Sequence, residues 1–171
     1  MFSNAPILEL GDISPAAKTP VLSDFHFFQI ESGGVMGGSA ISIVYSIIAI
    51  GIGATCGATS RWLLGLGLNA LYPSIPPGTL AANWLGAYII GLVSSIFAAC
   101  NITSSSYLHL MVITGFLGAL TTFSTFTDEM GTLIRHHDYW TAVGGIALHV
   151  CGSLVLFFLG IATFMIFHHP D

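Results

Sequence analysis

Hydroxyl side chains are concentrated in one segment of the sequence, TGFLGALTTFSTFTDE at residues 114–129. Five of them fall within seven positions, at Thr121, Thr122, Ser124, Thr125 and Thr127. A hydroxyl can donate a hydrogen bond to an anion that has lost its water, and the edge of an aromatic ring attracts the same anion. Because Phe123 and Phe126 lie among these hydroxyls, the segment predicts a track along which a small, strongly hydrated anion passes between donors.

Each hydroxyl also has a structural alternative, which is to bond back to a carbonyl one turn earlier in its own helix. Five hydroxyls together, preceded by Gly115 and Gly118, instead predict that the helix breaks in this segment. Irregular backbone at membrane depth is tolerated only where it is buried in protein or lies beside water. The segment is therefore expected to face a protein interior or a water-filled path.

Three further polar residues lie in apolar surroundings. Asn83 stands in the run GTLAANWLG, where it either forms a helix–helix hydrogen bond or lines a pore. His149 and Ser153 are four residues apart, so they share one face of a helix. A satisfied structural histidine is the alternative for His149, but its alignment with a serine favours a pore-facing position.

The elements that carry these residues are predicted to be membrane helices. Hydrophobic residues make up 54% of the chain, charged residues only 6%, and the mean hydropathy is +0.85, whereas a soluble domain has about 25% charged residues. A spanning helix needs roughly 20 apolar residues. The sequence predicts an all-α integral membrane protein with four spans, at 40–58 with a proline-free continuation to 71, 78–99, 108–134 and 139–167.

Small residues recur four positions apart within these spans, which predicts closely packed helix interfaces. The pairs are Gly53 with Gly57, Ala87 with Gly91, and Gly115 with Ala119.

Charge divides the chain into two regions. Residues 1–38 form a polar tail, predicted to be disordered, and residues 39–171 form the membrane domain. Within that domain the basic residues are Arg61 and Arg135, which bias orientation only weakly, so two copies inserted in opposite directions can pair. So few basic residues provide no electrostatic surface for nucleic acid.

Four motifs carry a family resemblance: GATSRW at 57–62, PPGTLAANWLG at 76–86, GFLGALTTFSTF at 115–126 and HVCGSL at 149–154. From about Ile43 onward the sequence closely resembles the small fluoride channels called Fluc or CrcB proteins. The resemblance implies passive, fluoride-selective export across the cell inner membrane, which lowers the cellular concentration and toxicity of fluoride. It also implies an antiparallel, dual-topology homodimer with two pathways, embedded in membrane lipid.

The same resemblance assigns roles to individual residues. The implied fluoride pathway comprises Asn83, Phe123, Ser124, Thr125, Phe126, His149 and Ser153. Arg61 is expected in a vestibule, and a structural sodium ion at the dimer centre is expected on the backbone carbonyls of Gly118 and Thr121. The chain departs from the family at Ala119, where many relatives have glycine, and at His149, where members often have tyrosine.

Other functions fit the sequence less well. A small dual-topology multidrug or cation exporter depends on an intramembrane glutamate in the first span, and residues 40–60 contain none. A membrane protein that acts only through packing explains the glycines but not the hydroxyls. An enzyme is not expected, because no nucleophile and base stand in a recognisable arrangement.

Overall fold

The structure is a computed structural model that describes residues 40–72 and 75–168, so the predicted tail at 1–38 lies outside it. Four segments are long and apolar enough to cross a membrane. In chain order the elements are α1 (Ala40–Leu68), η1 (Asn69–Leu71), α2 (Pro77–Ala99), α3 (Tyr107–His109), η2 (Leu110–Leu117), α4 (Gly118–Leu120), α5 (Phe123–Arg135) and α6 (Tyr139–Phe167). The four predicted spans are confirmed, including the continuation of the first span to Leu71.

Local chemistry determines where the second and fourth spans begin. Pro77 occupies the first turn of α2, where its missing N–H leaves no helical hydrogen bond unmade. The Gly78 N–H donates to Asn69 Oδ1 at 2.8 Å, which ties the start of α2 to η1. Asp138 caps α6 by accepting from the Thr141 N–H at 3.4 Å. The bond to Asn69 therefore ties the second span to the end of the first, and the Asp138 cap fixes where α6 begins.

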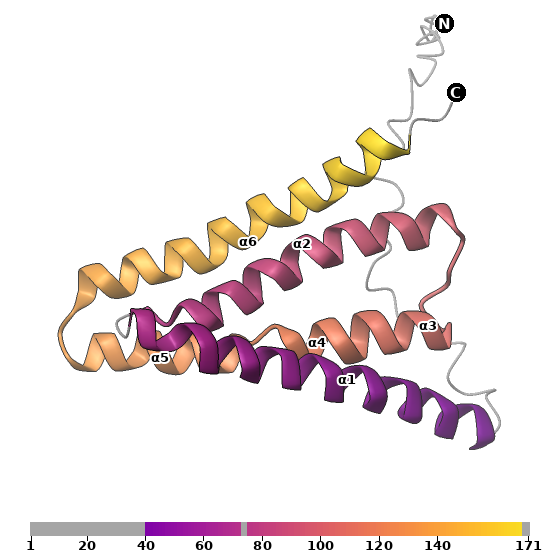
Figure 1. The fold of residues 1–171 in the computed structure, drawn as a ribbon, viewed down its shortest axis with the longest axis horizontal. Coiled ribbons are helices and arrows are strands. Elements are labelled where there is room, and N and C mark those ends of the chain that lie inside the picture. The colour runs from indigo at the N-terminus through magenta and orange to yellow at the C-terminus, as the bar shows by residue number, and fades with distance from the viewer. Residues whose placement is uncertain (1–39, 73–74, 169–171) are drawn as a thin grey trace, which may run out of the picture. The chain divides into compact units, whose positions relative to one another are not determined.

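Glycines set the contact between α2 and α6, which lie side by side in Figure 1. A Cβ atom added at Gly91 would overlap the Phe157 carbonyl oxygen, and one added at Gly160 would overlap the Tyr88 carbonyl oxygen. The two backbones are therefore in direct contact, the mode of packing typical of membrane helices. This contact holds His149 on α6 against Asn83 on α2.

A second glycine contact joins α1 to η2 and α4. A Cβ at Gly53 or Gly57 would overlap the backbone of η2, and one at Gly115 would lie 2.5 Å from the Ile50 carbonyl oxygen. The close packing predicted from the glycine spacing is confirmed at these three positions and at Gly91.

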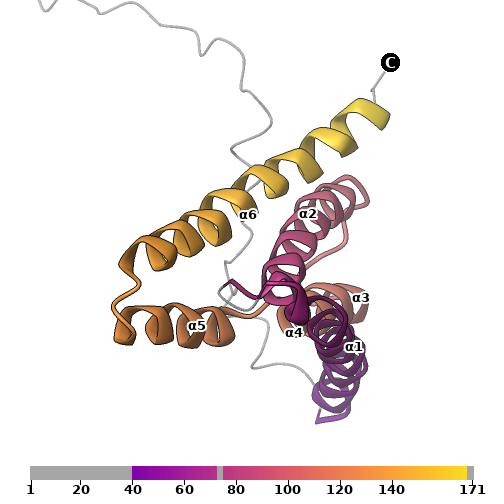
Figure 2. The same ribbon diagram turned by 60° about the vertical axis from the view of Figure 1, so that its left-hand side comes forward.

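The third span is interrupted, as the hydroxyl segment predicted. Its first half is largely a π-helix, η2, and ends at Leu120. Thr121 has a ψ of 153°, and Thr122 has φ and ψ of −146° and 116°, so both residues are extended. Gly118 keeps helical angles, which places the break after it rather than at it. Figure 2 shows the chain changing direction at this break, so that α5 leaves the line of α4 and joins α6.

Candidate functional site

The break in the third span is bridged by one side chain from α2. The Thr122 N–H donates to Asn83 Oδ1 at 2.7 Å, and Asn83 Nδ2 donates to the Thr122 carbonyl at 3.1 Å. In a continuous helix the same N–H would donate to the Gly118 carbonyl. Asn83 thus satisfies the N–H and the carbonyl of Thr122, the residue at which the helix is interrupted. The same two bonds give the Asn83 amide the hydrogen-bond partners that it needs inside the membrane.

Thr122 also starts the second half of the span. Its Oγ1 accepts from the Thr125 N–H at 3.2 Å and donates to Thr125 Oγ1 at 2.9 Å, which makes it the N-cap of α5. Thr121 and Thr127 behave differently, because their hydroxyls donate to the carbonyls of Leu117 and Phe123. Thr121 and Thr127 therefore follow the structural alternative, in which a hydroxyl bonds back to a carbonyl one turn earlier in its own helix.

His149 joins the cluster from α6. Its Nδ1 lies 3.1 Å from Asn83 Nδ2, and its ring packs against Phe126 with the centroids 4.8 Å apart. The Phe126 ring in turn contacts Phe123, with the centroids 5.4 Å apart. His149 and Phe126 are 4% and 8% exposed, whereas Phe123 is 78% exposed. Three of the predicted pathway residues, from α2, α5 and α6, thus meet at one buried point next to Thr122.

The other predicted pathway residues lie toward the outside of the chain. Ser124 and Thr125 are exposed on α5, and Ser153 is half-buried one turn beyond His149. Ser153 forms no hydrogen bond with any residue that the structure describes. A hollow of about 770 Å³ runs along α5, lined by Phe123, Ser124, Thr127, Asp128, Gly131 and Arg135. The hydroxyl donors therefore open onto a surface of this chain rather than into its interior.

Arg61, expected in a vestibule, and Gly118, expected to hold sodium with Thr121, both lie close to the break. Arg61 Nη1 donates to the Thr121 carbonyl at 3.4 Å, so its positive charge lies where α4 ends and carbonyls are exposed. Gly118 is exposed, and a Cβ there would meet only the Ile113 carbonyl oxygen, at 3.7 Å. Packing within the chain therefore does not require glycine at this position.

Sequence reasoning missed one polar pair. Thr79 on α2 donates to Glu129 Oε1 at 2.6 Å, and Glu129 Oε2 is buried without a hydrogen-bond partner among the described residues. Thr79 is 5% exposed. It stands four residues before Asn83 and thus on the same helix face, which was the signal available in the sequence. This face of α2 contacts Thr122, the N-cap of α5, through Asn83, and α5 itself through Thr79.

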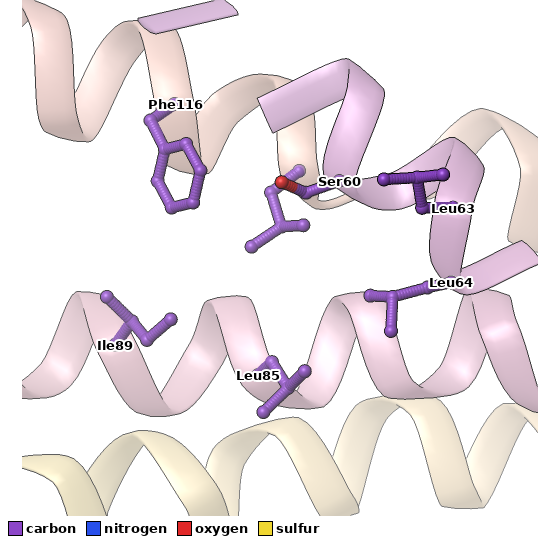
Figure 3. Close-up of a pocket in the computed structure, with 7 residues that line it drawn as sticks. Ser60, Leu63, Leu64, Leu85, Ile89 and Phe116 are labelled. Carbon is purple, nitrogen blue, oxygen red and sulfur yellow. The ribbon is translucent and has the colours of Figure 1, made fainter. Parts of the chain in front are cut away.

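A separate hollow of about 430 Å³ lies between α1, α2 and the first half of the third span. Figure 3 shows hydrocarbon side chains pointing into it, and its lining comprises Ser60, Leu63, Leu64, Leu85, Ile89, Phe116 and Leu120. Ser60 has the one polar side chain of this set. Since an anion needs several donors in place of water, this hollow is unsuited to carry one.

Comparisons with known proteins agree with the motifs. Residues 48–161 match the CrcB-like protein family, described as Camphor Resistance (CrcB). A protein of Tolumonas auensis named "Fluoride-specific ion channel FluC" is 56% identical over 121 residues, which cover 71% of this chain and 94% of the relative. Relatives with the same name from Chromohalobacter salexigens and Desulfovibrio desulfuricans are 57% and 54% identical over 119 residues, covering 70% of this chain and 89% and 92% of their own. The chain is a multi-pass membrane protein that belongs to the CrcB-like family.

Proposed function

We propose that this protein is a fluoride-selective channel through which fluoride leaves the cytoplasm passively, so that its concentration and toxicity in the cell fall. One observation carries the proposal. In a chain whose relatives are named fluoride-specific ion channels, a broken membrane helix brings Asn83, Thr122, Phe126 and His149 together. The protein acts in the cell inner membrane, and as a channel it catalyses no reaction.

The residues around the break suit a small, strongly hydrated anion. Such an ion crosses a membrane only where donors take the place of its water. Ser124, Thr125 and Ser153 supply hydroxyls, and the edges of Phe123 and Phe126 supply partial positive charge. The described helices α1, α2 and α6 contain no carboxylate, which disfavours an exporter coupled to protons or cations.

A second copy of the chain completes the pathway. Ser124 and Thr125 are exposed in the isolated chain, and polar groups at membrane depth do not face lipid. An antiparallel partner, permitted by the weak charge bias, would cover these hydroxyls and Phe123. The apolar side chains that stay exposed on α1 and α6 would contact lipid.

The carbonyls of Gly118 and Thr121 fit a structural sodium ion at the centre of such a dimer. Asn83 takes the Thr122 N–H that would otherwise occupy the Gly118 carbonyl, and a carbonyl bonded once, as at Thr121, keeps a second lone pair. Neutral oxygen ligands suit a hard cation. Bound there, sodium would supply positive charge to the carbonyl oxygens of Gly118 and Thr121.

Transport by the purified protein tests the channel. The protein is reconstituted into liposomes loaded with potassium fluoride, valinomycin is added, and released fluoride is followed with a selective electrode. Rapid fluoride release is expected, with no comparable release from liposomes loaded with chloride. Protein-free liposomes provide the baseline, and release no faster than that baseline would contradict the proposal.

The assembly and the ion are tested separately. A reporter fused to the C-terminus is expected on both sides of the membrane, and detection on one side alone would exclude the antiparallel homodimer. Prolonged removal of sodium is expected to slow fluoride release and to weaken the dimer. If both are unchanged after sodium removal, the sodium assignment is wrong while the channel function stands.

A further inference from the structure

Helix α5 has one buried face and one face that lines a hollow. Phe126 and Met130 lie on the buried face, with 8% and 3% of their surfaces exposed. The opposite face lines the hollow of about 770 Å³, whose two charged side chains are Asp128 and Arg135. Ser124, a residue of the proposed pathway, lines the same hollow. The two charges therefore stand beside the route by which an anion reaches Ser124.

Neither charge is neutralised within the part of the chain that the structure describes. Asp128 and Arg135 are seven residues apart, about 10 Å along the helix axis, and they form no ion pair with each other or with another described residue. The Arg135 guanidinium donates to Thr132 Oγ1 at 3.0 Å, and this neutral hydroxyl leaves its positive charge uncompensated. Both charges are thus free to act on an ion in the hollow.

Unpaired charges determine what fills this part of the hollow. Both residues belong to the membrane-spanning segment Tyr107–Arg135. A charged side chain in such a segment faces protein or water rather than lipid, and an unpaired charge buried in a dry interface is strongly unfavourable. The space between Asp128 and Arg135 is therefore expected to contain water, in which a hydrated anion can approach Ser124.

An anion entering this space meets the two charges in a fixed order. Arg135 lies in the last turn of α5, and Asp128 lies between it and Ser124. Asp128 is about 6 Å from Ser124 along the helix axis, whereas Arg135 is about 16 Å away, which is beyond the screening length of roughly 8 Å at physiological salt. The charge that dominates at Ser124 is therefore the negative one. In water, a like charge about 6 Å away lowers the local concentration of a monovalent anion about threefold.

The same repulsion acts more strongly on anions of higher charge. A divalent anion experiences twice the interaction energy, so it is depleted about tenfold where a monovalent anion is depleted threefold. Fluoride has a single charge, whereas sulfate and hydrogen phosphate have two. Asp128 therefore slows fluoride modestly and divalent anions much more.

We propose that Asp128 and Arg135 form a charge filter at the mouth of the pathway. Arg135 attracts anions to the hollow, and Asp128 is a specificity-determining residue that keeps divalent anions away from Ser124 without binding fluoride. This inference rests on the proposed channel function and goes beyond it, because it assigns discrimination by ionic charge to a position outside the residues that contact the ion.

Thiol labelling at Thr127 measures the potential in the hollow without measuring transport. Thr127 is exposed, lines the hollow and directly precedes Asp128. In Thr127→Cys the thiol is expected to favour a cationic over an anionic methanethiosulfonate reagent about tenfold more than free cysteine does, because Asp128 attracts the first and repels the second. The wild-type protein, with its free cysteines Cys56, Cys100 and Cys151, provides the background to subtract.

This preference is expected to disappear when Thr127→Cys is combined with Asp128→Asn. Failure of both reagents to react at Thr127→Cys would show that no water reaches the hollow. A reagent preference equal to that of free cysteine, with Asp128 present, would show that its charge is neutralised in the assembled protein. Either result would overturn the inference even if the wild-type protein conducts fluoride.

Fluoride release in the presence of sulfate tests the filter itself. At low salt, Asp128→Asn is expected to release fluoride about threefold faster than the wild type, because the repulsion at Ser124 is removed. The sulfate concentration that halves release should be about tenfold lower in this variant. Raising the concentration of monovalent salt should reduce the threefold difference, since screening weakens the field of Asp128. A purely structural effect of the substitution would not depend on salt in this way.

The matched control is Asp138→Asn, which removes the same charge outside the hollow and keeps the cap of α6, because asparagine caps as well as aspartate. Its fluoride release and sulfate sensitivity should equal those of the wild type. If Asp128→Asn also equals a conducting wild type, the filter is refuted while the channel function stands. If Asp128→Asn does not fold, labelling of Thr127→Cys with Asp128 intact decides the question.

Discussion

Replacing Gly57 with alanine tests how the first half of the broken span is held in place. A Cβ at Gly57 would lie 2.9 Å from the Phe116 carbonyl carbon and 3.0 Å from the Leu120 nitrogen, and it would overlap the Phe116 carbonyl oxygen. Ordinary contact begins at 3.4 Å, so α1 must move outward by at least about 0.5 Å. The obstacle is backbone rather than a flexible side chain, which leaves few ways to relieve it.

The expected loss of stability is about 1–3 kcal/mol, the usual range for overpacking a tight contact. Gly51 provides the control, because it lies on the same helix and a Cβ there would meet nothing within 4 Å. Both variants gain the same intrinsic helix preference of alanine over glycine, so the difference between them isolates the contact. We expect Gly57→Ala to unfold at lower denaturant concentration than Gly51→Ala, followed by tryptophan fluorescence in detergent micelles.

Fluoride release provides a second measurement on the same variants. Arg61 lies one turn beyond Gly57 and bonds to the Thr121 carbonyl. An outward movement of α1 therefore also moves the Arg61 guanidinium away from that carbonyl at the break. Gly57→Ala is expected to slow release, while Gly51→Ala keeps the wild-type rate. If the two variants differ by less than about 0.5 kcal/mol, the typical scatter of surface substitutions, the packing argument is refuted.

Three further substitutions address the site. Thr122→Val removes the cap of α5 and should lower stability by about 0.5–2 kcal/mol in the same unfolding assay, while Thr122→Ser keeps the cap and should restore it. Phe126→Ile removes the ring that packs on the site and should slow fluoride release in liposomes, whereas Phe158→Ile, at a position 62% exposed, should not. Thr79→Val leaves both oxygens of Glu129 without a partner and should cost about 1–3 kcal/mol in the unfolding assay; equal stability would show that this bond contributes nothing.

The spans were predictable because membrane helices depend on length and composition, both of which are visible in one sequence. The glycine contacts followed from spacing for a similar reason, since a small residue every four positions marks a helix face. The presence of a break was predictable, because glycines and hydroxyls cluster around the start of α5. Its location at Thr121 and Thr122 was not predictable, because it depends on Asn83, which lies on another helix.

The hydrogen-bond partners of individual side chains could not be predicted from the sequence either. The resemblance grouped Asn83 with Phe126 and His149 but could not show that Asn83 bonds to the backbone of Thr122. Glu129 bonds to Thr79, which stands fifty residues earlier in the chain. Such pairings are set by how helices pack together, and no periodicity within a single helix reports them.

The bridge from Asn83 to Thr122 has a kinetic consequence. Because the amide replaces the hydrogen bonds that a continuous helix would make there, the interrupted backbone is stable before any ion arrives. An ion entering the protein does not have to unwind a helix, and the helix does not have to re-form when the ion leaves. The rate of passage is then limited by exchanging water for side-chain donors, a fast local event, rather than by slower rearrangement of the membrane-spanning segments.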